Sequence, residues 1–542
     1  MESDTMSCIT VTNAGGEVLP CPEGRITPEI LQKSQGILKI GTRIPIVDTA
    51  CIWHADAFAV PPMKLPWRLD FHCGFSRSLP LLVFLNRNYR VKCAVGLTNG
   101  IDDCHVSCKM DQENCRYEVS FAVSVAPETG PFEVFRDVSG RPLIEVLHEY
   151  RAKIMPARPS YPQGAWEPVY CTWYAAHAAL TDEYMRRNAE EAARLGFGTF
   201  IVDDGWCYDE SKRVTPQTLP EWYRDVGDWR ISGKKLPGLR DTVSQAQKLG
   251  LNYIFWVAPF LVGSRCALDS DISRFLTELH EGYRICDPAD ATASRKTAES
   301  IFSVFETMAL DGLKIDFIDQ IEPDINRPHG RAVKRYLERL IGKIREAKPD
   351  ALIEFRQRYA TPVTAALATA FRAGDVPFDF VENYSRCVQL RLILGDGMPV
   401  HADPVYFGSG ESAETVGCHM IASLIGVPML SIDLRTVSDE HKKVIANYLR
   451  FYRDHQKTLN AGHWDFTLKN GFASAASCSG NDETVVFLTD AVPPEKFLQN
   501  PQGKLVVLNM SPDPVPFPGK LYDAQGNLCP CGHIPPGGRA ER

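Results

Sequence analysis

Residues 165–455 alternate short apolar segments, each long enough for one β-strand, with amphipathic helical segments. The expected strands are 168–174, 198–204, 251–259, 312–318, 351–356, 369–375, 397–403 and 427–433. Such alternation is typical of a parallel sheet covered by helices. Eight units over roughly 290 residues match a (β/α)8 TIM barrel in number and length. A doubly wound open sheet is the alternative, but the glycine-rich fingerprint expected after its first strand is absent.

The helical segments between these strands carry recognisable start and stop signals. Thr181 is suited to cap a helix that ends at Gly196, and Ser438 is suited to cap another. In the segment 331–348, Val333 and Leu337 begin an apolar stripe at helical spacing. We therefore expect helices between most of the strands.

The segments on either side of the barrel have strand character. In 117–125 apolar residues alternate with polar ones, which indicates an antiparallel β-sandwich, and 142–155 is expected to be a helix before a proline-containing linker. The segments 483–491 and 504–510 indicate a small sheet near the C-terminus. We predict three domains: an N-terminal β-sandwich over 1–160, the (β/α)8 barrel over 161–455 and a small C-terminal β-sheet domain over 456–542.

Composition excludes several classes of partner. The chain has 542 residues, of which 44% are hydrophobic and 23% charged, as in globular proteins. Its net charge of −8 and the lack of a basic cluster argue against nucleic acid and anionic membranes. Residues 1–18 lack the pattern of a secretory signal, and the apolar runs are too short for a membrane helix. The 17 scattered cysteines suit a reducing compartment, so we expect a cytoplasmic protein without nucleic-acid or membrane partners.

Two cysteine clusters raise the question of a metal site. The segments "CHVSC" (104–108) and "CPC" (529–531) contain thiols, which zinc binds. Neither has the paired spacing of a structural zinc site. We expect no metal ion and no other cofactor.

Charged residues lie at the ends of several expected strands, where barrel enzymes carry their reacting groups. They are Asp203 and Asp204 on the second strand, Lys314 and Asp316 on the fourth, Arg372 and Asp375 on the sixth, and His401 and Asp403 on the seventh. A single Asp after a strand more often caps a helix or shapes a turn. Several carboxylates at one barrel mouth, however, need cations, water or a ligand, because unpaired buried charge is costly.

Lys314 and Asp316 are two residues apart on one strand, so both side chains should point into the barrel. The lysine is then expected to lower the pKa of Asp316 and keep it ionised, as a nucleophile requires. A second carboxyl group across the mouth would supply the acid, and two carboxylates in these roles are typical of glycoside hydrolysis. A metal-dependent hydrolase would also use acids, but it usually has several histidines, and His401 is isolated.

Four motifs in chain order resemble the retaining α-galactosidases of glycoside hydrolase family 36, the melibiase group, which is related to family 27. They are "VDDGW" (202–206), "GDW" (227–229), "GLKIDF" (312–317) and "RAGD" (372–375). The resemblance covers 165–455 well and is weaker over the flanking domains. Each motif is short, and their specificity comes from their order and their positions at strand ends.

The resemblance implies roles for particular residues. Asp316 would be the nucleophile and Asp375 the acid/base, with their carboxyl groups about 5–5.5 Å apart. The substrate-binding residues that we expect are Asp203, Asp204, Trp206, Trp229, Lys314, Trp173, Arg356, Arg372 and His401. Homo-oligomers are common among relatives, so a homo-oligomer is an expectation by analogy.

Two segments depart from the family pattern. Residues 353–362, "IEFRQRYATP", replace a turn rich in Cys and Gly that approaches the sugar, and "FWVAPF" (255–260) lacks two acids. These departures affect the expectation of galactose specificity more than that of glycosidase chemistry. Two interpretations stay open for Arg356, Arg358, Arg372 and Arg391: they pair with nearby carboxylates as supports, or one of them contacts an acidic sugar. His401 either lines the site or is a packed histidine.

We predict an enzyme of carbohydrate metabolism, a retaining α-glycosidase and specifically an α-galactosidase. It would hydrolyse terminal α-linked galactose in an oligosaccharide or glycoside through a covalent glycosyl-enzyme. One alternative is a retaining α-glycosidase or transglycosidase for a different sugar, including an acidic one. Another is a carbohydrate-binding relative without catalysis, and a metal-dependent barrel hydrolase ranks last.

Overall fold

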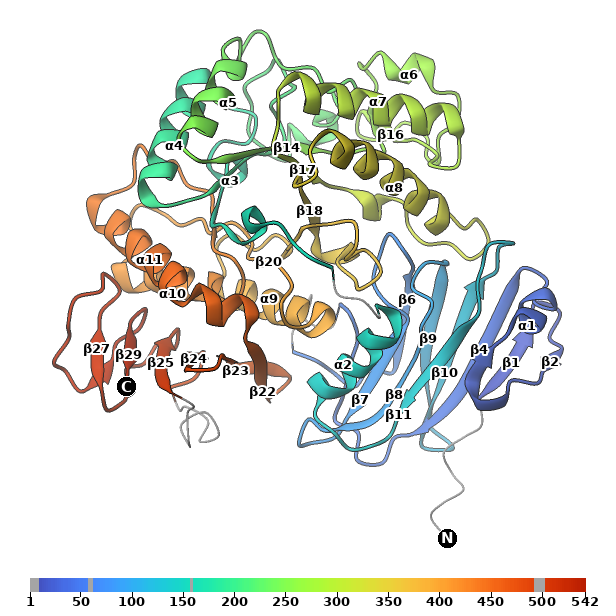
Figure 1. The fold of residues 1–542 in the computed structure, drawn as a ribbon. Helices are drawn as coiled ribbons and strands as arrows, with labels where there is room; N and C mark the ends of the chain where they lie inside the picture. Colours follow the sequence, from blue (N-terminus) through green and yellow to red (C-terminus); the bar gives the residue numbers. More distant parts are fainter. Residues whose placement is uncertain (1–8, 57–61, 156–158, 492–502) are drawn as a thin grey trace.

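The computed structural model describes residues 9–56, 62–155, 159–491 and 503–542. Along the chain, strands in blue are followed by a mixed helix and strand region in green to orange and by a sheet in red (Figure 1). None of the helices in these ranges is long and apolar enough to cross a membrane.

Two antiparallel sheets pack face to face in the N-terminal region. Their strand orders are β2-β1-β4-β10-β9-β6 and β3-β11-β8-β7-β5. The bounds are β1 Thr10–Asn13, β2 Val18–Leu19, β3 Arg25–Ile26, β4 Ile37–Pro45, β5 Cys51–Trp53, β6 Arg68–Cys73, β7 Leu81–Leu85, β8 Val91–Leu97, β9 Cys104–Asp111, β10 Arg116–Ser124 and β11 Phe132–Asp137, with the short helix α1 at Pro28–Gln32. Tyr117, Val119, Phe121 and Val123 of β10 are buried against the facing sheet, as their alternation predicted. The N-terminal sandwich is confirmed.

Eight parallel strands follow, in the sheet order β20-β19-β18-β17-β14-β13-β12-β21. They are β12 Val169–Cys171, β13 Thr199–Val202, β14 Asn252–Val257, β17 Gly312–Ile315, β18 Leu352–Arg356, β19 Ala370–Arg372, β20 Val400–His401 and β21 Met429–Leu430. The two edges of this sheet meet where the Val427 N–H donates to the Val400 carbonyl (2.7 Å) and the Ala402 N–H donates to the Val427 carbonyl (3.1 Å). Each expected strand contains one of the observed strands, so the (β/α)8 barrel is confirmed.

Helices cover the outside of the barrel (Figure 1). They are α4 Asp182–Leu195, α5 Leu239–Lys248, α7 Ala291–Thr307, α8 Gly330–Ala347, α9 Phe380–Leu394, α10 Ala413–Ser423 and α11 Asp439–Ala461. Thr181 caps α4 by accepting a hydrogen bond from the Tyr184 N–H, and Gly196 ends it with φ 103°. A hairpin, β15 Leu261–Gly263 and β16 Tyr283–Ile285, is inserted between β14 and β17. Two short helices are α3 Trp173–Ala176, directly after β12, and α6 Leu268–Asp271, between β15 and β16.

The flanking regions are joined to the barrel by packing. Helix α2, Leu143–Ile154, follows the sandwich, and Arg151 donates to the Leu392 carbonyl of α9 (2.7 Å). The C-terminal sheet has the order β22-β23-β24-β25-β29-β27. Its strands are β22 His463–Lys469, β23 Phe472–Ser479, β24 Glu483–Leu488, β25 Lys504–Asn509, β27 Lys520–Tyr522 and β29 Arg539–Glu541, and β26 Val515–Pro516 pairs with β28 His533–Ile534 beside it. The division into three domains stays a prediction, and its limit at 455/456 falls within α11.

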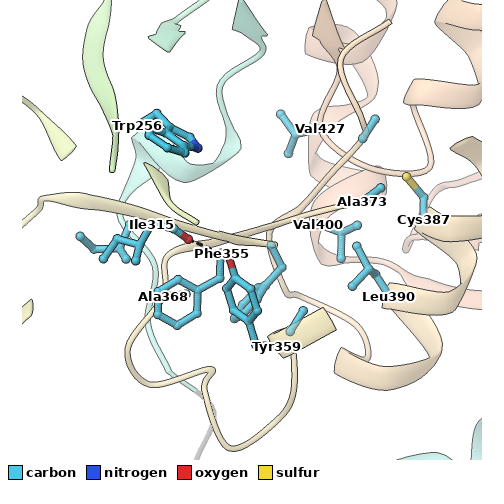
Figure 2. Close-up of a cluster of buried hydrophobic side chains, with 14 of the residues drawn as sticks. Trp256, Ile315, Phe355, Tyr359, Ala368, Ala373, Cys387, Leu390, Val400 and Val427 are labelled. Atoms are coloured by element: carbon cyan, nitrogen blue, oxygen red, sulfur yellow. Dashed lines mark hydrogen bonds between the residues drawn. The ribbon is translucent and has the colours of Figure 1, made fainter. Parts of the chain in front are cut away.

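A layer of buried apolar side chains lies beneath the C-terminal ends of β17, β18 and β20. Figure 2 shows Ile315, Phe355 and Val400 from these strands together with Leu390 of α9. The Tyr359 hydroxyl, in the turn after β18, donates to the Ile315 carbonyl at 2.8 Å (Figure 2). This bond and the packing around it fix the turn after β18 against the end of β17.

Candidate active site

A cavity of about 520 Å³ opens where several barrel strands end. Its acidic lining residues are Asp56, Asp203, Asp204, Asp316, Asp319 and Asp375, and its basic ones are Lys314, Arg356, Arg358, Arg372 and Arg386. Trp173, Tyr223, Trp256 and Phe317 supply its aromatic wall. A hollow of comparable size between α11 and the C-terminal sheet lies away from these strand ends and is not part of the site.

Asp316 follows β17 and is almost fully buried. One carboxylate oxygen accepts from the indole N–H of Trp256 (2.9 Å), and the other accepts from Arg356 (3.0 Å) and from the Phe317 N–H (2.7 Å). Burial alone would raise the pKa of Asp316, but the charges of Arg356 and Lys314 outweigh it and hold the pKa below its ordinary value. The structure therefore presents an ionised, oriented carboxylate, which is what a nucleophile requires.

Phe317, directly after Asp316, has a strained backbone with φ 55° and ψ 28°. Bulky residues rarely adopt this left-handed conformation, which persists only where the surroundings fix it. Its ring packs edge-on against Trp256 (centroids 6.0 Å apart) and Tyr223 (5.4 Å). The aromatic wall thus holds the chain in the conformation that ends β17 at Asp316.

Lys314 lies on β17, two residues before Asp316. Its ammonium group donates to the carboxylate of Asp203 at the end of β13. Burial would lower the pKa of Lys314, but the negative charge of Asp203 raises it above its ordinary value. The expectation that Lys314 lowers the pKa of Asp316 is therefore confirmed, and it does so through its nearby charge. The direct hydrogen-bond partner of Lys314 is Asp203, and the cation bonded directly to Asp316 is Arg356.

Asp204 differs from its neighbour Asp203 in having neutral partners. The Tyr208 hydroxyl (2.7 Å) and the Trp222 indole N–H (2.6 Å) both donate to its carboxylate. Burial raises the pKa of Asp204 to about 7, because these hydrogen bonds offset only part of the cost of burying its charge. Asp204 can therefore change protonation state near neutral pH.

Asp375, after β19, is the half-exposed carboxylate of the site, with 46% of its side chain accessible. It accepts from Arg356 on one oxygen (2.9 Å) and from Arg372 on the other (2.9 Å). Burial of part of the group would raise its pKa, but the two guanidinium groups lower it far more, and the pKa lies well below its ordinary value. One guanidinium group, that of Arg356, therefore bonds to both Asp316 and Asp375.

Arg372 supports the site from below and is buried. It bonds to Asp375 and also to Asp403, whose carboxylate accepts from the Val376 N–H (2.7 Å) and the Tyr174 hydroxyl (3.0 Å). This geometry favours the interpretation of Arg372 as a support. Arg391 lies outside the cavity lining and donates to the carbonyls of Ile425 and Met398.

Three expected substrate-binding residues lie behind the cavity instead of lining it. Trp206 is buried and donates to the Trp256 carbonyl (2.9 Å), while the ring of Trp229 packs against that of Trp256 (centroids 5.8 Å apart). His401 lies inside the barrel, where its ring nitrogens contact Glu354 (3.0 Å) and the Ala165 carbonyl (2.9 Å). Trp206 and Trp229 therefore position Trp256. For His401, the contacts favour the interpretation as a packed histidine over that as a residue lining the site.

Several lining residues were not predicted from the sequence. Trp256 is the second residue of "FWVAP" (255–259), where only the period-2 alternation of a strand could have indicated an inward side chain. Asp56 comes from the N-terminal region and Arg386 from α9, and no local pattern links either to the strand ends. Asp319, in the turn after β17, also lines the cavity and pairs with Arg358 (3.4 Å).

The chemistry available here is that of two carboxylates across a cavity. In the described ranges, no group of three or more His, Cys, Asp or Glu side chains is arranged to hold a metal ion. Asp316 is buried and ionised, and Asp375 is open to the cavity. Such a pair can attack a sugar carbon from one side and exchange a proton on the other.

Comparisons with known proteins find relatives of this chain. Residues 132–327 match the Melibiase family model. The bifunctional α-galactosidase/sucrose kinase AgaSK of Mediterraneibacter gnavus is 29% identical over 328 residues, which cover 54% of this chain and 32% of that protein. An α-galactosidase of Escherichia coli is 30% identical over 116 residues, which cover 21% of this chain and 14% of that protein. The matches thus span about a third or less of these two relatives.

Solved structures share the fold over most of the chain. A variant of the family 36 α-galactosidase AgaA from Geobacillus stearothermophilus, in complex with raffinose, superposes with a TM-score of 0.65 at 15% identity, covering 93% of this chain and 77% of that one. The galactosidase domain of AgaSK gives a TM-score of 0.64 at 12% identity, covering 98% and 88%. At such identities the likeness concerns the fold.

Proposed function

We propose that this chain, a relative of the glycoside hydrolase family 36 α-galactosidases, hydrolyses terminal α-linked galactose with retention of configuration. Three of the four family motifs lie within the matched residues 132–327, and "RAGD" lies beyond them. The observation that carries the proposal is the pair Asp316 and Asp375, which face one cavity closely enough to bond to the same guanidinium group.

In the first step, the Asp316 carboxylate attacks the anomeric carbon, and the bond from that carbon to the glycosidic oxygen breaks. Asp375 gives its proton to the departing oxygen, and the product is a covalent glycosyl-enzyme on Asp316. In the second step, water attacks the same carbon while Asp375 takes its proton, and the bond to Asp316 breaks. Two inversions give net retention.

Arg356 must leave its position between the two carboxylates before this reaction can occur, because the scissile bond needs that space. Its departure removes one of the two cations beside Asp375, and the pKa of Asp375 then rises toward the range in which it can act as an acid. Substrate binding and acid function are coupled in this way.

The sugar would occupy the inner part of the cavity. Lys314, Asp203 and Asp204 offer donors and acceptors for its hydroxyls, and Trp256 and Trp173 offer apolar walls. Raffinose is bound in one of the similar structures and stachyose in another, so α-galactosyl oligosaccharides of this kind are the substrates that we propose.

The test is hydrolysis of 4-nitrophenyl α-galactoside followed by NMR of the first product. Retention predicts that α-galactose forms first and then mutarotates. The variant Asp316→Ala should lose at least about a thousandfold in kcat, and Asp241→Asn on the exposed side of α5 is the matched control. A first product with the β configuration would overturn retention, and normal turnover by Asp316→Ala would overturn the nucleophile assignment.

A second candidate keeps the mechanism and changes the sugar or the acceptor. It is favoured by Arg356, which lines the cavity at the turn where the family pattern leads us to expect residues such as Cys and Gly. A panel of aryl α-glycosides, including an acidic one, separates these cases, as does a search for transfer products. Binding without turnover across the panel would instead indicate a carbohydrate-binding protein.

The location and the assembly of the protein also belong to this proposal. The scattered cysteines favour the cytoplasm, and the relatives favour a homo-oligomer by analogy. Cell fractionation tests the first statement, and light scattering on the purified protein tests the second.

A further inference from the structure

The cationic side chains of the cavity are unevenly distributed between its inner and outer parts. Lys314 is buried at the inner end, where its charge is matched by Asp203. Toward the solvent the arginines dominate: Arg356 is 21% exposed and Arg358 is 60% exposed. Since Asp375 is also half exposed, the outer arginines lie on the side from which a leaving group would depart.

Arg358 and Arg386 each have guanidinium N–H groups that donate to none of the described residues. Among the described residues, the one acidic partner of Arg358 is Asp319, at 3.4 Å. Arg386 uses Nε and Nη2 to bind Glu382, and no hydrogen bond to the described residues is made by its Nη1. A Cβ on Gly374 would collide with that Nη1, so the spare donor lies directly against the backbone beside Asp375.

The fold holds the turn that carries Arg356 and Arg358 in place. Tyr359 bonds to the Ile315 carbonyl (2.8 Å), and the Gln357 side chain accepts from the Gly374 N–H (2.7 Å). The turn is thereby attached to the ends of both β17 and β19. Arg356 and Arg358 therefore lie on a turn that the fold holds in place as part of the cavity wall.

Arg356 makes two charge-assisted hydrogen bonds, and a substrate must break both to reach Asp316. A neutral leaving group offers the guanidinium group no comparable partner. A phosphate group offers several anionic oxygens in the geometry that a guanidinium group binds in a bidentate way. An anion at this position would therefore accept hydrogen bonds from Arg356 in place of those that Arg356 gives up at Asp316 and Asp375.

We propose that this site, besides oligosaccharides, accepts α-galactosyl phosphates, and that Arg356, Arg358 and Arg386 bind the phosphate group that leaves from the anomeric carbon. The inference rests on the proposed glycosidase function and names a further substrate class for the same site. In the reaction, Asp316 attacks the anomeric carbon, the carbon–oxygen bond breaks, and its electron pair stays on the phosphate, which leaves as an anion. No proton from Asp375 is needed in this step, and the ionised Asp375 then takes a proton from the attacking water.

The ionised state of Asp375 agrees with a reaction in which Asp375 gives no proton to the leaving group and takes one from water. When Arg356 turns to the phosphate, Arg372 still bonds to Asp375 and still lowers its pKa, which suits a base for water. A substrate whose leaving group needs no proton can therefore react without the rise in the pKa of Asp375 that an oligosaccharide requires.

The experiment compares kcat/KM for three α-galactosides: galactose 1-phosphate, 4-nitrophenyl α-galactoside and a neutral disaccharide. We expect the phosphate ester to exceed the disaccharide by about tenfold or more. Arg358→Gln and Arg386→Gln should each lower kcat/KM for the phosphate ester by about tenfold relative to that for the aryl galactoside. Arg339→Gln, an exposed position on α8, is the matched control and should leave this ratio unchanged.

Calorimetry with inorganic phosphate gives a readout that does not need turnover. The wild type should bind phosphate, and both variants should bind it at least about tenfold more weakly. Hydrolysis of the aryl galactoside and the disaccharide without a preference for the phosphate ester would overturn this inference and leave the proposed function intact. Phosphate binding with no turnover of any α-galactoside would overturn the proposed function, and with it the reaction step above. An equal preference for a 4-carboxyphenyl galactoside would place the anion away from the anomeric oxygen and overturn the inference.

Discussion

Lys314 and Asp203 form an ion pair inside the barrel, where their side chains are only 3% and 4% exposed. The two residues come from β17 and from the end of β13, so the pair joins two strands that are separated by β14. A buried pair gains little net stability when it forms, but the loss of one partner leaves an uncompensated buried charge. It also fixes the carboxylate that we expect to bind a sugar hydroxyl.

Replacement of Lys314 by Met should therefore destabilise the fold strongly. We expect Lys314→Met to lower the free energy of unfolding in urea by about 3–5 kcal/mol, because Asp203 stays charged and buried without its cation. The double variant Lys314→Met with Asp203→Asn should recover most of this loss. Lys348→Met is the control, since the pair of Lys348 with Asp311 is part-exposed and should contribute about 1 kcal/mol or less. Equal losses for Lys314→Met and the double variant would contradict this account.

Asp375→Ala tests the second carboxylate through its dependence on the leaving group. A disaccharide needs a proton on its departing alcohol, whereas 4-nitrophenolate departs without one. We expect kcat/KM to fall by about 10²–10⁴ for the disaccharide and by much less for the aryl galactoside. The measurement is steady-state kinetics on both substrates with the same enzyme preparation. Equal losses on both substrates would indicate that Asp375 acts in another way.

Arg356 controls the ionisation of both carboxylates, and Arg356→Gln should show this in the pH profile. The guanidinium group lowers the pKa of Asp316, so its removal raises that pKa toward the ordinary value or above it, since burial then dominates. Asp316 must be ionised to attack. The acidic limb of kcat/KM for the aryl galactoside should therefore move to higher pH, by about 1 unit or more.

Arg345→Gln is the control for that profile, because Arg345 binds the carbonyls of Ala366 and Leu367 and lies outside the cavity lining. Its acidic limb should coincide with that of the wild type. If the acidic limb of kcat/KM in Arg356→Gln lay at the same pH as in the wild type, Arg356 would not set the charge state of Asp316.

The order of strands and the acids at their ends follow from local patterns, and both could be predicted. Strand period and helix caps depend on neighbouring residues, and Asp316 and Asp375 lie where the motifs place them. The partner of each charge depends instead on which side chains the stagger of the barrel brings together. In the register of β18 and β19, Arg356 is opposite Arg372, which places two cations beside Asp375.

Local sequence patterns also could not predict whether a residue lines the cavity or packs behind it. Trp206 follows β13, Trp256 is near the end of β14 and Trp229 lies in the connection between these strands, yet Trp256 alone of the three lines the cavity. The others pack behind it, and that layering is set by long-range packing of loops from different strands. Asp56 enters the site from another region of the chain for the same reason.

Asp204 gives a prediction for stability against pH. Its pKa in the folded protein is about 7, above the ordinary value of an unfolded Asp, so the folded state retains a proton that the unfolded state releases. This contribution to stability is fully present below about pH 4 and is lost as pH rises through about 7. Asp204→Asn cannot ionise and should lose less stability than the wild type between pH 5 and pH 8, by up to about 3 kcal/mol. Urea denaturation at both pH values measures the difference, with Asp241→Asn as the control, and parallel losses in Asp204→Asn and the wild type would show that Asp204 does not titrate in this range.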